Sequence, residues 1–135
     1  MAGAISCTIG YAAFMSFSRE DLALLGAAEE VEIETGLPDG PRHRTIIWIV
    51  VDGSDVFVRS VRGPAGRWYR ELVANPEVAV HLDGRRLASR AVPARDPESV
   101  TRTSSSLKTK YARDPAMRAM LRPDTLDTTI RLEPA

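Results

Sequence analysis

Arginine side chains gather in one stretch that also contains glycines and adjacent aromatic residues. Residues 42–70 carry six arginines and two acidic residues, whereas residues 1–41 carry seven acidic residues and one arginine. Arginine has a fixed charge and a forked donor set, so arginines beside the free N–H groups of a helix start suit a phosphate. Arg59, Arg62 and Arg67 have this arrangement. The same arginines would equally suit ion pairs with the acidic residues at 29–34, and the residues alone leave both interpretations open.

Other reactive residue types occur without a supporting motif. Lys110 and Tyr111 together suit an anion or a polarised carbonyl, but Tyr111 also completes a helical apolar stripe, which favours a structural role. His43 and His81 lack motif partners, so we assign no catalytic residue. The single cysteine, Cys7, cannot form an internal disulfide, which fits a reducing, cytoplasmic compartment. No histidine accompanies the acids at 29–34, so we expect solvated surface there and no metal site.

The size and composition of the chain limit its class. With 135 residues we expect one domain at 16–135, preceded by an N-terminal extension at 1–15 that is loosely ordered. No apolar run approaches the roughly 20 residues of a membrane helix, so we expect no membrane contact. The net charge is zero and the basic stretch is short, which argues against nucleic-acid binding and for a small phosphorylated ligand.

Strand and turn patterns dominate the rest of the chain. The run 44–51 is continuously apolar and predicts a central strand, paired through the turn 52–55 with a second strand at 56–61. Trp48 in this run is expected in the core. The pair Asp83-Gly84 predicts a second hairpin, and alternation predicts a strand with one wet face at 29–35. The remaining predictions are helices at 18–28, 64–74, 96–111 and 114–122, the last closed by Pro123, and a final strand at 125–132.

The order of these elements indicates the fold class. Five or six mostly antiparallel strands follow one another with short helices in the gaps, and helices do not separate the strands regularly. This order excludes a doubly wound parallel sheet. We therefore expect an α+β protein built on a small antiparallel closed or split β-barrel with short flanking helices.

Three segments carry a resemblance to a known family. RTIIWIVVDGSDVFVRSVRGPAGRWYRE, SSLKTKY and the ending TLDTTIRLEP resemble the DUF2255 family of small bacterial proteins, which is placed in the FMN-binding split-barrel superfamily. The resemblance extends over about residues 16–134. More distantly, the chain is similar to deazaflavin-dependent nitroreductases, which have an RTTP strand, a glycine loop, a WY pair and an ANP turn. This chain has Ile46 and Ile47 where those relatives have threonine and proline. The resemblance implies a homodimer that binds a flavin or coenzyme F420 between its subunits.

The matching positions give the candidate site. Arg44 and Thr45 match the arginine–threonine pair of the relatives' cofactor strand, and the second strand and its loop face the cofactor phosphates there. The cofactor-binding candidates are Arg44, Thr45, Arg59, Ser60, Arg62, Gly63, Arg67, Trp68, Tyr69, Lys110 and Tyr111.

We expect an oxidoreductase that uses FMN or coenzyme F420 to transfer hydride to or from a small organic molecule. Two alternatives remain open: a barrel enzyme without cofactor, such as a cyclase or isomerase, and a ligand-binding dimer without catalysis.

Overall fold

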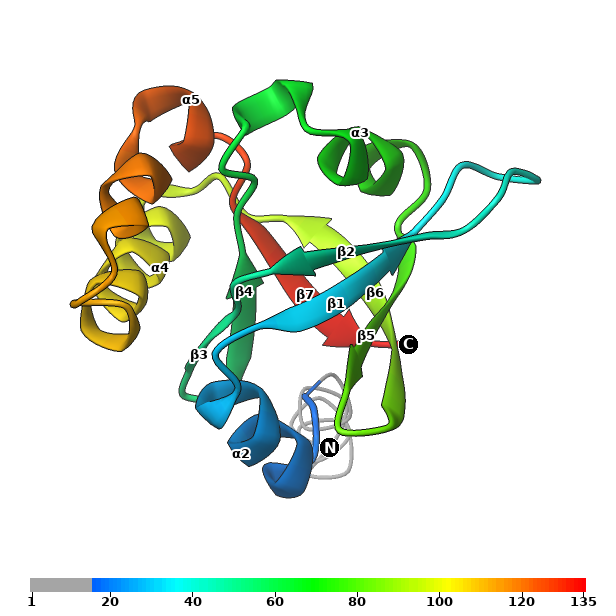
Figure 1. Ribbon diagram of the computed structural model, residues 1–135, viewed down its shortest axis with the longest axis horizontal. Coiled ribbons are helices and arrows are strands. Elements are labelled where there is room, and N and C mark those ends of the chain that lie inside the picture. Colours follow the sequence, from blue (N-terminus) through cyan, green and yellow to red (C-terminus); the bar gives the residue numbers. More distant parts are fainter. Residues whose placement is uncertain (1–15) are drawn as a thin grey trace, which may run out of the picture.

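The computed structural model describes residues 16–135 and shows one curled antiparallel sheet of seven strands with helices around it (Figure 1). The extension predicted at 1–15, with Cys7, lies outside the described residues. The strands are β1 (Val31–Thr35), β2 (His43–Ile47), β3 (Val50–Asp52), β4 (Asp55–Val58), β5 (Glu77–Leu82), β6 (Arg85–Pro93) and β7 (Ile130–Pro134). Their order in the sheet is β2-β1-β5-β6-β7-β4-β3.

The chain between β2 and β3 forces this sheet to curl. These strands lie at opposite edges of the sheet, yet only Trp48 and Ile49 separate them in sequence. Three peptide steps span at most about 11 Å, whereas the edges of a flat seven-stranded sheet are about 29 Å apart. The two edges must therefore approach each other. The α+β split β-barrel expected from the sequence is confirmed.

The single central strand predicted at 44–51 is wrong. The run forms β2 and β3, which end the ladder on its two edges. Its apolar character has a different cause: Ile47 and Ile49 enter the barrel core, while Val50 enters a second cluster against the helices. Side chains distant in sequence bond the backbone of Ile49 in place of a strand partner.

Both predicted hairpins are present. Asp52 pairs with Asp55 across the first turn, where Gly53 has a φ of 64°. In the second turn Asp83 and Gly84 have φ values of 51° and 73°, as a type I′ turn requires. The second strand of the first hairpin ends at Val58 and does not reach residue 61.

The strand predicted at 125–132 begins five residues later, at Ile130. Thr128 and Thr129 donate hydroxyl hydrogen bonds to the carbonyls of Thr125 and Leu126, at 2.6 and 2.7 Å. These local bonds support a helical turn and compete with an extended chain. Pro123, expected to close a helix, instead begins α5 (Pro123–Leu126).

Helices surround the barrel on three sides (Figure 1). Ser18 caps α2 (Arg19–Ala27) as predicted, because its Oγ accepts a hydrogen bond from the N–H of Asp21 at 3.0 Å. The helix expected from Pro64 is divided into a 3₁₀ turn, η1 (Gly63–Ala65), and α3 (Arg67–Ala74). The other helical elements are α4 (Pro97–Lys110), capped by Asp96, and the 3₁₀ helix η2 (Pro115–Leu121). None of the helices in residues 16–135 combines the length and apolar character that crossing a bilayer requires.

Alternation along β4 divides the core into two parts. Val56 and Val58 point into the barrel, while Phe57 joins Leu107 and Tyr111 in the cluster under α4. Both faces of this strand are buried. The backbone that follows it, residues 59–66, is therefore held firmly at the end of the barrel where the predicted site residues lie.

Candidate functional site

A pocket of about 480 Å³ lies between β2, the loop after β4 and the start of α3. We call it the cradle pocket. Five of the predicted cofactor-binding residues line it, namely Thr45, Ser60, Arg62, Arg67 and Trp68, together with Ile46, Val61 and Gly66. The structure thus brings together residues that are up to 23 positions apart (45 to 68) in the sequence.

Local hydrogen bonds fix the shape of the loop. Ser60 Oγ donates to the carbonyl of Gly63 at 2.8 Å, and the N–H of Gly63 donates back to the carbonyl of Ser60 at 2.9 Å. Gly63 has a φ of 66°, which favours glycine. At Gly66 a Cβ atom would lie 2.5 Å from Ser60 Oγ, so this position also requires glycine. Ser60 therefore shapes the loop, and its hydroxyl proton is already used.

Two arginines line the cradle pocket, and its lining among the described residues includes no acidic residue. Arg62 and Arg67 are exposed, and neither takes part in the ion pairs or side-chain hydrogen bonds of residues 16–135. Gly66 is the N-cap of α3 and has no side chain, so no side chain caps the first turn of this helix. Its free N–H groups and the helix dipole favour an anion at this position.

Thr45 adds an unusual polar atom. Its Oγ1 is buried and has no hydrogen-bond partner, the one such side-chain atom found among the described residues. A buried hydroxyl without a partner is unfavourable, commonly by about 1–3 kcal/mol. A buried polar atom without a partner calls for an explanation, and a water, ion or ligand bound beside it in the pocket that Thr45 lines would be one.

Arg59 points away from the cradle pocket and into the protein. Its guanidinium donates to Thr129 Oγ1 at 2.8 Å and Ser104 Oγ at 2.9 Å, and to the carbonyls of Met120 and Val100 at 3.2 and 2.7 Å. The side chain is 2% exposed, and burial lowers the pKa of Arg59 to about 10. The sequence predicts Arg59 as part of the phosphate site. In the structure its N–H groups donate hydrogen bonds to α4, η2 and the chain before β7.

A smaller pocket of about 240 Å³ lies beside the cradle pocket, and Arg59 lines it. We call it the tryptophan pocket. It shares Ile46, Val61 and Trp68 with the cradle pocket; its other lining residues are Glu30, Ile47, Trp48, Arg59, Ala116 and Met120. The two pockets thus form adjoining parts of one recessed region.

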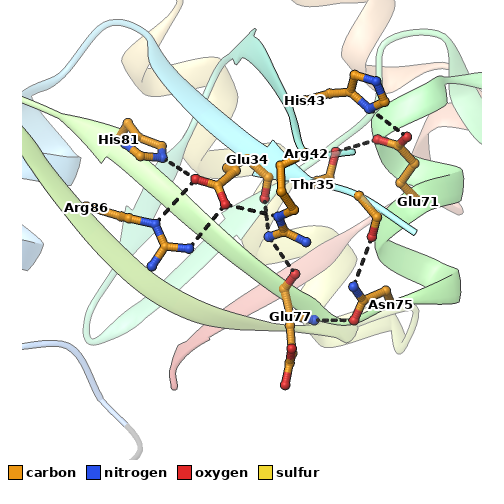
Figure 2. A network of polar contacts seen from close by, with 10 residues as sticks. Glu34, Thr35, Arg42, His43, Glu71, Asn75, Glu77, His81 and Arg86 are labelled. Carbon is orange, nitrogen blue, oxygen red and sulfur yellow. Dashed lines mark hydrogen bonds and ion pairs between the residues drawn. The ribbon is translucent and has the colours of Figure 1, made fainter. Parts of the chain in front are cut away.

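Glu34, on the acidic strand, pairs with side chains other than the predicted Arg59, Arg62 and Arg67. Glu34 accepts hydrogen bonds from Arg42 at 3.0 Å and from Arg86 at 3.1 Å, and lies 2.7 Å from His81 Nε2 (Figure 2). The bonds from Arg86 and His81 lower the pKa of Glu34 to about 2. Glu34 is thus a paired carboxylate, and the expectation of a solvated acidic face fails at this residue. The alternative of ion pairs with the acids at 29–34 concerned Arg59, Arg62 and Arg67, and none of these three forms an ion pair among the described residues. Arg42 and Arg86 take that place.

Arg44 lies outside the cradle pocket. Side chains alternate along a strand, so Arg44 faces the opposite side of β2 from Thr45. It lines a different pocket, with Glu32 and His81. The structure therefore separates the two members of the predicted arginine–threonine pair.

A second polar contact joins β2 to α3. His43 Nδ1 lies 2.9 Å from Glu71 Oε2, and Thr35 Oγ1 donates to the other oxygen of Glu71 at 2.8 Å (Figure 2). Glu71 is buried, with 9% of its side chain exposed. Sequence reasoning missed Glu71, although its spacing of three and four residues from Trp68 and Arg67 places it on the same face of α3.

Lys110 and Tyr111 form hydrogen bonds with the backbone of Ile49, in the short segment between β2 and β3. Lys110 Nζ donates to the carbonyls of Ile49 and Leu25 at 2.6 and 3.2 Å, and burial lowers its pKa to about 8. The hydroxyl of Tyr111 donates to the carbonyl of Glu29 at 2.7 Å and accepts from the N–H of Ile49 at 3.3 Å. These side chains line neither the cradle pocket nor the tryptophan pocket.

The aromatic residues differ in their positions. The ring of Trp48 stacks on that of Tyr111, with centroids 4.0 Å apart and planes 4° apart, and the residue also lines the tryptophan pocket. Trp68 is buried between the two pockets. Tyr69 is half-buried against the barrel core and lines neither of them.

Solved structures with the same architecture include redox and haem proteins. An F420-H2-dependent reductase matches with a TM-score of 0.60 at 17% identity, over 78% of this chain and 93% of that one. The haem storage protein HutZ from Vibrio cholerae matches with a TM-score of 0.60 at 15% identity, over 90% and 92%. A Listeria innocua protein assigned as a pyridoxamine 5′-phosphate oxidase matches with a TM-score of 0.59 at 15% identity, over 86% and 90%. At these identities the likeness establishes the fold.

No curated protein matches this chain in a sequence comparison. Residues 21–132 match the family described as an uncharacterised protein conserved in bacteria, DUF2255. That span includes both pockets. The chain therefore belongs to the DUF2255 family, as its sequence motifs indicated.

Proposed function

We propose that this protein binds FMN or coenzyme F420 with a phosphate in the cradle pocket and acts as an oxidoreductase on a small organic molecule. The observation that carries the proposal is the meeting, in one pocket, of two unpaired arginines, an uncapped helix start and the orphaned hydroxyl of Thr45. A phosphate group offers several acceptor oxygens and negative charge, which match these donors. Neighbours with the same fold include an F420-dependent reductase, which supports a cofactor of this kind.

The residues of this chain supply binding and orientation. Arg62 and Arg67 would hold the phosphate, the N–H groups at the start of α3 would fix its position, and Trp68 would cover the adjoining apolar part. The cofactor supplies hydride transfer when bound, so the protein needs no side chain that reacts covalently. Burial of Trp68 and Ile47, with half-buried Trp48 beside them, favours exclusion of water from a reaction there.

The proposal includes a homodimer. Ile46 and Val61 line both pockets and are 64% and 42% exposed, although both are apolar. Ile46 lies on β2, an edge strand whose outer backbone groups have no strand partner within residues 16–135. A second copy seated here would cover both side chains and close the region. We expect Ile46→Asp to lower the mass measured in solution from dimer to monomer.

A titration tests cofactor binding. The purified protein is titrated with FMN and with F420 while the fluorescence of Trp48 and Trp68 is followed. We expect saturable quenching, and Arg62→Ala should weaken binding by about ten- to a hundredfold, the effect of losing one charged hydrogen bond. Arg70→Ala is the matched control, because Arg70 is exposed on the same helix and does not line the cradle pocket.

The opposite results distinguish the alternatives. A colourless protein that is indifferent to both cofactors would overturn the proposal. If such a protein converts a substrate without added cofactor, it is a barrel enzyme of another kind, such as a cyclase or isomerase. If it only binds ligands, it is a dimer without catalysis.

A further inference from the structure

Arg59 is a buried cation that no acidic residue pairs with in the part of the chain that the structure describes. None of the ion pairs among residues 16–135 involves it, and its four hydrogen bonds all go to neutral oxygens. Moving a charge out of water costs several kcal/mol unless an opposite charge compensates. A guanidinium has five N–H donors, so one N–H on Nη2 remains without a partner among the described residues. Both facts indicate that an anion completes this site.

The surroundings of Arg59 indicate what kind of anion fits. The tryptophan pocket has walls of two indole rings and of aliphatic side chains, including Ile47 and Met120. Trp48 is held in place because Tyr111 stacks on one of its faces. Flat apolar walls favour a planar ring, and aromatic contacts add about 0.5–1.5 kcal/mol to the area that they bury. A volume of about 240 Å³ is smaller than the roughly 300–1,000 Å³ of drug-sized ligand sites, so a single ring fits better.

One acidic residue, Glu30, also lines this pocket. It is exposed and takes part in no ion pair of the described residues, so it does not neutralise Arg59. A carboxylate at the rim repels a bound anion weakly, because exposed charges are screened by solvent and salt. Glu30 therefore provides an internal test of the sign of the ligand's charge.

We propose that the tryptophan pocket binds a planar aromatic carboxylate, with its carboxylate on the Arg59 guanidinium and its ring against Trp48 and Trp68. The assignment of this ligand as the substrate rests on the proposed function, but its binding does not. The cradle pocket would hold the cofactor phosphate, and the adjoining position of the two pockets would place the aromatic ring next to the cofactor. The alternative is that Arg59 only ties α4 and η2 to the sheet.

The first experiment uses the wild-type protein and matched ligands. Calorimetric titration with benzoate should show saturable binding, and benzamide, which has the same shape without the charge, should bind at least about tenfold more weakly. Cyclohexanecarboxylate, which keeps the charge without the flat ring, should also bind more weakly than benzoate. Equal affinity for benzoate and benzamide, or no binding of benzoate at millimolar concentrations, would overturn the proposal.

Variants then place the ligand in this pocket. Ala116→Trp should abolish benzoate binding, because Ala116 is exposed on η2 and a large side chain there fills the pocket. Glu30→Gln should strengthen benzoate binding a few-fold by removing a repulsive charge. Arg59→Gln should abolish it, and circular dichroism checks that this variant is folded. Unchanged benzoate binding in Ala116→Trp would refute the assignment even if Arg59→Gln fails to fold.

The two proposals fail separately. Arg62→Ala should weaken FMN or F420 binding and leave benzoate binding unchanged, because Arg62 does not line the tryptophan pocket. Benzoate binding without any cofactor binding would refute the proposed function alone. Cofactor binding with no preference for benzoate over benzamide would refute the aromatic carboxylate alone.

Discussion

Replacing Glu34 by glutamine should destabilise the protein in a manner that depends on pH. The carboxylate contacts three side chains from β5, β6 and the loop before β2: His81, Arg86 and Arg42 (Figure 2). Hydrogen bonds from Arg86 and His81 lower its pKa from 4.5 to about 2. A shift of about 2.5 units corresponds to at most about 3.4 kcal/mol of folding free energy at neutral pH. Arg86 is half-exposed and solvent screens its charge, so we expect about 1–2 kcal/mol.

The sign follows from the direction of the shift. Because the pKa of Glu34 is lower in the folded protein, its contribution is complete above pH 4.5 and disappears as the pH falls towards 2. Urea unfolding of wild type and Glu34→Gln should therefore give a clear difference in unfolding free energy at pH 5. The difference should shrink progressively below pH 4.5. Subtraction removes the contributions of the other carboxylates, which both proteins share.

Glu32→Gln is the matched control. Glu32 lies on the same strand, but none of the ion pairs or side-chain hydrogen bonds of the described residues involves it. We expect this variant to stay within about 0.5 kcal/mol of wild type, the usual range for a surface substitution. If Glu34→Gln lost no more than Glu32→Gln at pH 7, or if the difference did not change between pH 5 and pH 2, the reasoning would be refuted.

Three further substitutions test the local structure. Tyr111→Phe should lower the unfolding free energy by about 1–3 kcal/mol, because the N–H of Ile49 loses its acceptor. Burial raises the pKa of Tyr111 to about 12, so the wild-type protein should lose stability between pH 10 and 12, and the variant should lack this loss. Gly63→Ala should cost more than Gly53→Ala, since both have positive φ but only the first Cβ would lie 2.8 Å from a carboxylate oxygen; equal unfolding midpoints would contradict this. Ser18→Ala should cost about 1 kcal/mol in thermal unfolding by removing the cap of α2, and no loss would mean that the helix end is frayed.

Turn and cap chemistry could be read from the sequence because it depends on neighbours along the chain. The pair Asp83-Gly84 supplies positive φ at both positions. Ser18 stands directly before a helix, and its side chain accepts a hydrogen bond from the N–H of the third helical residue, Asp21. The break of the run 44–51 could not be read in this way. Its cause is a pair of side chains, Lys110 and Tyr111, which are about 60 positions away and supply hydrogen bonds to Ile49. A local pattern contains no information about such a partner.

The candidate site was predicted in part for the same reason. Arg62, Arg67 and Trp68 lie close together in the sequence, so a short loop had to bring them near one another. Thr45, on an edge strand, was predicted only through the family resemblance, and it lines the same pocket. The direction of Arg59 could not be predicted, because β4 ends at Val58 and the alternation of side chains ends with it. Its hydroxyl and carbonyl acceptors come from three segments more than 40 positions later.

The distribution of charge explains how a chain with no net charge keeps a positive site. Glu34, on the acidic strand, is already paired with Arg42 and Arg86 and contacts His81, and it forms no ion pair with Arg59 or Arg62. Arg62 stays exposed and Arg59 stays buried, both without an acidic partner among the described residues. A fold that needed these cations only for stability would gain from pairing them, whereas an anion site requires that they remain unpaired. The stability of the Glu34 cluster and the proposed binding of an anion in the cradle pocket thus depend on the same distribution of charge.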